Sequence, residues 1–334
     1  GNVNYITEQR PLNDSILQIF DVPFAIDQVF TTKRIQHSLQ AEHSFREGVK
    51  WRGMASFNDY VRERITYRNL LSQGSEEVSG NLEDNDTTSF ELFISRFTRV
   101  QKLNNGWDLS AGAEGRYEIG SGKRIEGNEQ TLSEVSGFAS LEVPIGKLTV
   151  RPGIRAIYNS VYQAPVIPSL HLRFERKNDI FRMSAARGFR APELKNLYFF
   201  FVDVNHNIRG NQDLLAETSW NLQAEWSRRF YCKKSLHEIS INGFHNVVED
   251  QITLAITDDE TQLFQYVNID ESELLGASAN WQLNASGWKV NLNYQYVATK
   301  NSLTTTGADF GNYFGSSQVS GSFSYKIEKA NLGI

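Results

Sequence analysis

The residues whose types point to binding chemistry lie in one stretch of the chain, between Glu193 and Glu217. Its three consecutive phenylalanines cannot all be buried by one face of a strand, so some must cover an opening or contact a flat apolar ligand. The candidate ligand-binding residues of this stretch and its border are Arg190, Tyr198, Phe199, Phe200, Phe201, His206 and Arg209.

Two of these candidates also have a purely structural interpretation. An arginine at a strand end is usually solvated or salt-bridged, so an Arg190 ion pair with Glu193 or Glu217 competes with direct ligand contact. The segment Asn205-His206-Asn207 also fits a simple turn, because asparagine adopts left-handed conformations and caps its own backbone. The sequence leaves both interpretations open.

The sequence lacks the residue patterns of common hydrolases and metal enzymes. It contains no Gly-x-Ser-x-Gly, His-Glu-x-x-His or Cys-x-x-Cys. The segment Gly120-Ser121-Gly122-Lys123-Arg124 lacks the first glycine and the final Ser or Thr of a phosphate-binding loop. We therefore expect neither an enzyme nor a cofactor.

A second candidate site is an acidic stretch that contains Glu76, Glu77, Glu83, Asp84 and Asp86. Hard cations such as Ca²⁺ take several oxygen ligands at close range, so this stretch is a candidate cation site. The alternative is a solvated loop, because clustered like charges repel one another.

The composition limits the classes of partner and compartment. The formal net charge is -5 and no basic stripe is present, which argues against a nucleic-acid partner. Cys232 is the single cysteine, so no intramolecular disulfide can form. No apolar run approaches the ~18 residues of a membrane helix, but a transmembrane β-barrel hides its apolar residues at alternate positions of ~10-residue segments.

Apolar and polar residues alternate along many segments of this chain. Along residues 148–158, for example, Arg151 and Arg155 oppose an apolar face, and Arg173 does the same further on. This period of two predicts an all-β fold with about thirteen strands. We expect these three arginines to point into the lumen of a barrel and to meet acidic partners there.

The connections between the expected strands alternate in length. Tight turns are expected at residues 46–48, 104–106, 144–146, 176–179, 231–234 and 284–287, and long polar stretches at residues 69–89, 120–132, 159–166, 188–216, 249–262 and 298–316. Short turns on one rim and long loops on the other are typical of a transmembrane, antiparallel, up-and-down β-barrel.

The beginning of the chain lacks this pattern. Residues 1–30 contain Pro11 and Pro23 and show no sustained alternation, so we expect an irregular segment with one short strand at about residues 16–20. The barrel portion is expected to occupy residues 31–334. By our count of its strands, this chain alone cannot close a barrel.

Four segments of the sequence carry a family resemblance. They are residues 186–198 (ARGFRAPELKNLY), residues 210–214, where Gln212 stands in place of a usual proline, residues 241–252, and residues 266–278, where Ala277 and Ser278 replace a usual Val and Glu. Together they resemble the barrel of TonB-dependent outer-membrane receptors, over most of residues 31–334.

The resemblance implies part of a 22-stranded barrel in the outer membrane of a Gram-negative bacterium. It also implies a receptor that binds a scarce nutrient chelate of the haem, siderophore or cobalamin type at its outer face for TonB-driven uptake. In haem receptors of this family, a histidine placed like His206 serves as an iron ligand.

The implied partners are the TonB complex of the inner membrane through a plug domain, the nutrient chelate, outer-membrane lipids and a surface lipoprotein. Neither a plug domain before residue 31 nor a terminal aromatic strand is visible, so we expect a middle segment of a receptor. The alternatives are another outer-membrane β-barrel, such as a porin or a barrel hydrolase, and a soluble β-rich binding protein.

Overall fold

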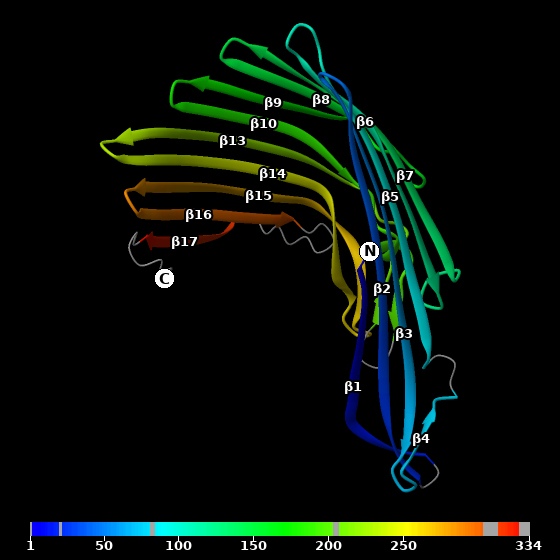
Figure 1. Cartoon of the computed structure of the whole chain (residues 1–334). Coiled ribbons are helices and arrows are strands. Elements are labelled where there is room, and N and C mark those ends of the chain that lie inside the picture. The colour runs from blue at the N-terminus through cyan, green and yellow to red at the C-terminus, as the bar shows by residue number, and fades with distance from the viewer. Residues whose placement is uncertain (1, 20–21, 81–83, 203–206, 303–312, 327–334) are drawn as a thin grey trace.

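The chain forms one curved sheet of 17 strands (Figure 1). The computed structural model describes residues 2–19, 22–80, 84–202, 207–302 and 313–326. Nearly all strand pairs are antiparallel and join neighbours along the chain, so the sheet is a meander. The all-β, antiparallel, up-and-down fold class is therefore confirmed.

Fourteen long strands make up the wall of the sheet. They are β1 (Asn2–Ile19), β2 (Val22–Arg46), β3 (Val49–Leu70), β5 (Asp86–Lys102), β6 (Asp108–Gly122), β7 (Glu129–Ile145), β8 (Leu148–Asn159), β9 (Ile167–Arg176), β10 (Asp179–Arg190), β13 (Glu217–Cys232), β14 (Ser235–Asp258), β15 (Leu263–Ala285), β16 (Trp288–Ser302) and β17 (Phe314–Tyr325). Most of them exceed the length of strands in soluble proteins.

Four short elements lie in the connections. β4 (Ser75–Val78) extends the β3–β5 connection, and α1 (Leu194–Tyr198), β11 (Phe200–Val202) and β12 (Asn207–Arg209) lie between β10 and β13. Among the described residues, no helix has the length and hydropathy needed to cross a membrane.

The two rims of the sheet differ as expected. At one rim, which we call the short-turn rim, consecutive strands are joined by tight turns in which Gly48, Gly106, Gly146 and Gly287 adopt positive φ. A glycine tolerates this conformation because it has no Cβ. The longer connections, including the one with α1, gather at the opposite rim, which we call the loop rim.

The two faces of the wall also differ. Directly paired residues share a face, so the register assigns every strand position to one side or the other. One face, the apolar face, exposes large hydrophobic side chains, including Phe57, Phe93, Tyr117, Ile154, Leu170, Leu222 and Tyr294. In a membrane barrel such a face contacts lipid, and the polar face lines the lumen.

The arginines that we expected in the lumen lie on the polar face. Arg155 donates to Glu114 Oε1 at 2.7 Å, and Arg173 pairs with Glu175. The expectation of acidic partners is therefore confirmed for these two. For Arg151, whose guanidinium reaches the Ser140 hydroxyl at 3.4 Å, an acidic partner stays a prediction.

The first thirty residues differ from expectation. Instead of an irregular segment, the structure has β1 and the first part of β2, which pair along most of their length. Pro11 does not prevent this, because β1 is an edge strand and one of its two rows of backbone groups has no partner strand. Pro23 is the second residue of β2 and precedes the residues of β2 that pair with β3. This strand largely accounts for the difference between about thirteen expected long strands and the fourteen observed.

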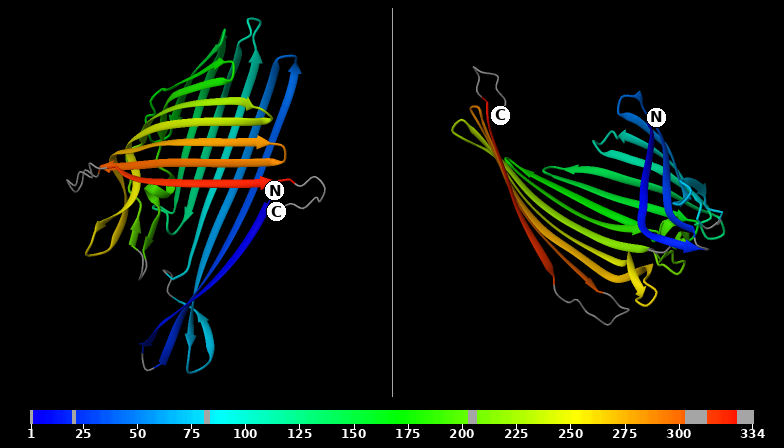
Figure 2. Two further views of the ribbon diagram at one scale, coloured as in Figure 1. Left: turned by 90° about the vertical axis from the view of Figure 1, so that its left-hand side faces the viewer. Right: turned by 90° about the horizontal axis from the view of Figure 1, so that it is seen from below.

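Within the described residues, the sheet is one contiguous wall with two edges. β1 pairs with β2 alone and β17 with β16 alone, and the views in Figure 2 show the wall open between them. Each edge presents unpaired backbone groups, which cost several kcal/mol apiece in a bilayer. A bilayer would therefore favour the pairing of both edges.

Candidate functional site

The connection between β10 and β13 folds back onto the polar face of the wall near the loop rim. Leu194 and Leu197 of α1 are buried and anchor it. They belong to a hydrophobic cluster made up of Ile125, Leu132, Leu194, Leu197, Leu214 and Ile252. At Gly120 on β6, an added Cβ would lie 2.5 Å from Leu194 Cδ2, so this glycine makes room for the helix.

The second half of the connection is fixed by backbone contacts. β11 pairs with β12, and β12 pairs in parallel with the outer end of β15. The Asn211 side-chain amide donates to the Tyr266 carbonyl at 2.9 Å. An added Cβ at Gly210 would lie 2.5 Å from the Leu197 carbonyl oxygen, so only glycine allows this close approach.

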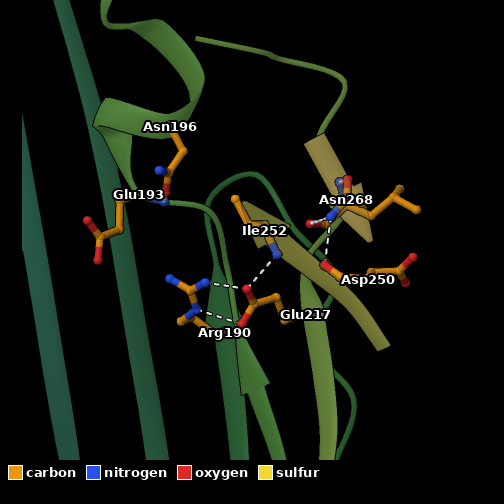
Figure 3. A network of polar contacts seen from close by, with 8 residues as sticks. Arg190, Glu193, Asn196, Glu217, Asp250, Ile252 and Asn268 are labelled. Carbon is orange, nitrogen blue, oxygen red and sulfur yellow. Dashed lines mark hydrogen bonds and ion pairs between the residues drawn. The ribbon is translucent and has the colours of Figure 1, made fainter. Parts of the chain in front are cut away.

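An ion pair closes the base of the connection (Figure 3). Arg190 Nε donates to Glu217 Oε2 at 2.7 Å, and Arg190 Nη2 donates to Glu217 Oε1. The same Oε1 accepts the Ile252 backbone N–H at 2.7 Å. Glu217 therefore ties β10, β13 and β14 together, and Arg190 has a structural partner rather than a free guanidinium.

A recess of about 470 Å³ opens on the polar face between this connection and the wall. Its lining residues are Phe30, Arg34, Tyr60, Arg62, Arg64, Asp86, Thr88, Phe90, Arg124, Lys195, Phe199, Phe201, Ile208, Leu254 and Tyr266. We call this set the aromatic recess. Its volume lies within the range of ~300–1,000 Å³ that is typical of small-molecule sites.

Cations in the aromatic recess lie over aromatic rings. The Arg62 guanidinium lies 4.5 Å from the centre of the Phe30 ring, and the Arg34 guanidinium lies 5.3 Å from that of Tyr60. Lys195 Nζ lies 5.6 Å from the centre of the Phe199 ring. Such contacts hold cations in place without neutralising their charge.

One carboxylate lines the recess, and a cation is already paired with it. Asp86 Oδ2 lies 2.9 Å from Arg124 Nε, and both side chains are largely buried. Arg34, Arg62 and Lys195 have no carboxylate partner among the described residues. The recess therefore carries a net positive charge.

Burial changes the acidity of the phenols near the recess. Desolvation raises the pKa of Tyr266, although a hydrogen bond with Asn196 partly opposes this shift. Burial likewise raises the pKa of Tyr162, which packs against the hydrophobic cluster. Both phenols are thus neutral near pH 7.

The structure separates the predicted ligand residues into groups. Phe199 and Phe201 line the recess, whereas Tyr198 packs against the hydrophobic cluster. Phe200 and Arg209 form a cross-strand pair that faces away from the recess, because successive strand residues alternate sides. His206 lies outside the described residues.

Several recess residues were not predicted from the sequence. Phe30, Arg34, Tyr60 and Arg62 come from β2 and β3, far from the connection in the chain. The available signal was the placement of Tyr60 and Arg62 at alternate positions, which puts an aromatic ring and a cation on one strand face.

Asp84 and Asp86 of the acidic stretch are engaged in other contacts. Ser79 donates to Asp84, and the Asn85 side chain bridges the Thr66 N–H at 2.9 Å and the Ser79 carbonyl at 3.0 Å. No group of three or more His, Cys, Asp or Glu in the described part of the chain could hold a metal ion. Glu83 lies outside that part.

The sequence matches the model of one protein family. A family model described as "TonB dependent receptor-like, beta-barrel" matches residues 4–333. Comparison with curated protein sequences gave no match.

Solved structures share the fold at low identity. The siderophore receptor PirA from Acinetobacter baumannii is 14% identical, with a TM-score of 0.65 over 93% of this chain and 55% of that chain. PirA from Pseudomonas aeruginosa is 14% identical, with a TM-score of 0.55 over 96% of this chain and 66% of that one. A double mutant of the hemophore receptor HasR from Serratia marcescens, in complex with its hemophore HasA and heme, is 11% identical, with a TM-score of 0.56 over 90% of this chain and 61% of that one.

This chain spans 55–66% of the length of those three structures. At these identities the likeness concerns the fold of the barrel wall.

Proposed function

This chain belongs to the TonB-dependent receptor family, and from that premise we propose that it forms the wall and part of the ligand site of an outer-membrane receptor for a nutrient chelate. The chelate would bind at the loop rim, which faces the outside of the cell in such barrels. Uptake would follow when the TonB complex of the inner membrane acts on the receptor. No covalent step on the ligand is required.

The aromatic recess is the observation that supports a ligand class. Arg34, Arg62 and Lys195 carry charges that no described carboxylate neutralises, and each lies over an aromatic ring. An anionic chelate with flat aromatic groups would gain both charge attraction and ring contact. Ferric siderophores with aromatic arms and haem meet this description better than cobalamin, which is bulky and carries little net negative charge.

His206 has a role in ligand binding only if the ligand is haem. This residue lies within the connection that covers the recess, between α1 and β12 in the chain. A neutral imidazole there would supply an axial ligand to the iron. If the ligand is a siderophore, the recess cations and rings bind it without a role for His206.

A binding panel with the full-length receptor tests the proposal. Tryptophan fluorescence would be followed during titration with a ferric tris-catecholate, haem and cobalamin. We expect saturable binding of at least one anionic aromatic chelate and weaker binding of cobalamin. Equal binding of all three, or binding of none, would contradict the proposal. For haem, loss of the Soret shift in His206→Ala would assign the axial ligand.

A further inference from the structure

The apolar face of the wall contains a groove that the proposed uptake function does not use. It encloses about 430 Å³ and crosses β9, β10, β13 and β14. Ala185, Ala224 and Gly243 form its floor, because their small side chains leave space between larger neighbours. Leu170, Leu172, Met183 and Leu222 form its sides.

A cation lies beside this groove, toward the loop rim. Arg187 is two residues beyond Ala185 on β10, so its side chain projects from the same face, about 7 Å further along the strand. It pairs directly with Trp220 of β13, whose indole is exposed on that face. Trp220 is the kind of residue that marks the boundary between lipid tails and headgroups in barrels.

Arg187 lacks a hydrogen-bond acceptor for one of its buried nitrogen atoms. Its side chain is half-buried, and its Nε is buried without a hydrogen-bond acceptor. No carboxylate among the described residues forms an ion pair with it. A buried guanidinium nitrogen without an acceptor is costly, so an anionic group from outside the described chain would stabilise it.

We propose that the groove and Arg187 together hold one phosphorylated lipid of the outer membrane. An acyl chain would lie in the groove over Ala185, Ala224 and Gly243, and the headgroup phosphate would accept hydrogen bonds from Arg187 beside Trp220. Guanidinium and phosphate form strong, often bidentate pairs. In an outer-membrane barrel, lipid covers the apolar face. A soluble ligand or a protein would have to displace that lipid, so we expect the occupant of the groove to be a lipid.

Native mass spectrometry of the full-length receptor in detergent tests this site. The probes are phosphatidic acid and a diacylglycerol with the same acyl chains, which differ only in the phosphate. We expect wild-type receptor to retain one phosphatidic acid in preference to diacylglycerol. Arg187→Gln should reduce that retention about tenfold, as expected for the loss of a hydrogen-bonded charge pair, and Arg187→Lys should keep part of it.

Two further variants distinguish the contribution of the groove to lipid retention from that of the Arg187 charge. Gly243→Leu fills the floor of the groove and should reduce retention of both lipids. A Cβ at this position would meet only the Gly276 carbonyl at 3.8 Å, so the wall should tolerate it. Arg151→Gln is the matched control on the polar face and should change nothing.

Several results would overturn this inference. Equal retention of phosphatidic acid by wild type and Arg187→Gln would remove the phosphate contact. Displacement of the lipid by inorganic phosphate alone would point to an anion site without a lipid. Unchanged retention in Gly243→Leu would remove the groove.

Discussion

Arg190 and Glu217 face each other across the β10–β13 ladder, and Arg190 Nε donates to Glu217 Oε2 at 2.7 Å. Glu217 also accepts the Ile252 N–H at 2.7 Å. One carboxylate thus joins both ends of the β10–β13 connection to β14. We expect this contact to hold the connection against the wall.

Glu217→Ala should loosen the connection. It leaves the Arg190 guanidinium and the Ile252 N–H without their partner, at about 1–3 kcal/mol in the free energy of local opening. Hydrogen exchange should become faster in α1 and at Ile252. Glu225→Ala, which removes the Arg182 partner at 2.6 Å elsewhere on the polar face, is the control and should leave α1 protected. Equal effects of both variants would contradict a special role for Glu217.

Gly210→Ala should displace the hairpin of β11 and β12. Its Cβ would come within 2.5 Å of the Leu197 carbonyl oxygen, and backbone atoms cannot move aside as a flexible side chain can. We expect proteolysis within the connection to become faster, while the barrel wall stays intact. Gly137→Ala on β7 is the control, because no heavy atom lies within 4 Å of that Cβ. Identical digestion patterns for the two variants would show that the approach of Gly210 to α1 is unimportant.

Leu172→Lys tests the assignment of the two faces. Leu172 lies in the middle of β9 on the apolar face and lines the groove. A lysine near the bilayer midplane should reduce the free energy of unfolding by about 2–4 kcal/mol. His171→Lys, one residue away on the polar face, should have a much smaller effect. Urea unfolding of the receptor in lipid vesicles measures both, and the reverse order would mean that the faces are exchanged.

The sequence alone was sufficient to predict features of the fold that depend on a local residue pattern. Alternation places Arg155 and Arg173 on one face because side chains in a strand have a period of two. The turns at Gly48 and Gly146 were visible because glycine at positive φ marks a tight turn. The strand β1 was missed because prolines and weak alternation conceal an edge strand.

The candidate site could be predicted only in part. Phe199 and Phe201 were identified because consecutive rings are unusual on one strand. Tyr60 and Arg62 were not, because they join the recess only when the connection folds back across the wall. Such contacts depend on burial of Leu194 and Leu197 far from β3, and no local pattern encodes them.

Tyr266 should ionise at a higher pH than an ordinary tyrosine. Burial favours the neutral phenol, so its pKa is raised above the usual value of about 10. The stabilising contribution of the neutral phenol is complete below pH ~10, the unfolded pKa, and is lost as the pH rises through the folded pKa. The tyrosinate absorbance of wild type minus that of Tyr266→Phe gives the titration. A midpoint at or below the ordinary value would contradict the burial of this phenol.

The central claim is that the cations of the aromatic recess bind an anionic aromatic chelate. The most direct measurement is the affinity of the full-length receptor for its best chelate from the panel, compared with Arg62→Gln. We predict an affinity about tenfold weaker for this variant, because it removes one charge-assisted contact. The control is Arg151→Gln, which removes a cation from the polar face outside the recess and should leave the affinity unchanged. Unchanged binding in Arg62→Gln, or an equal loss in both variants, would contradict the claim.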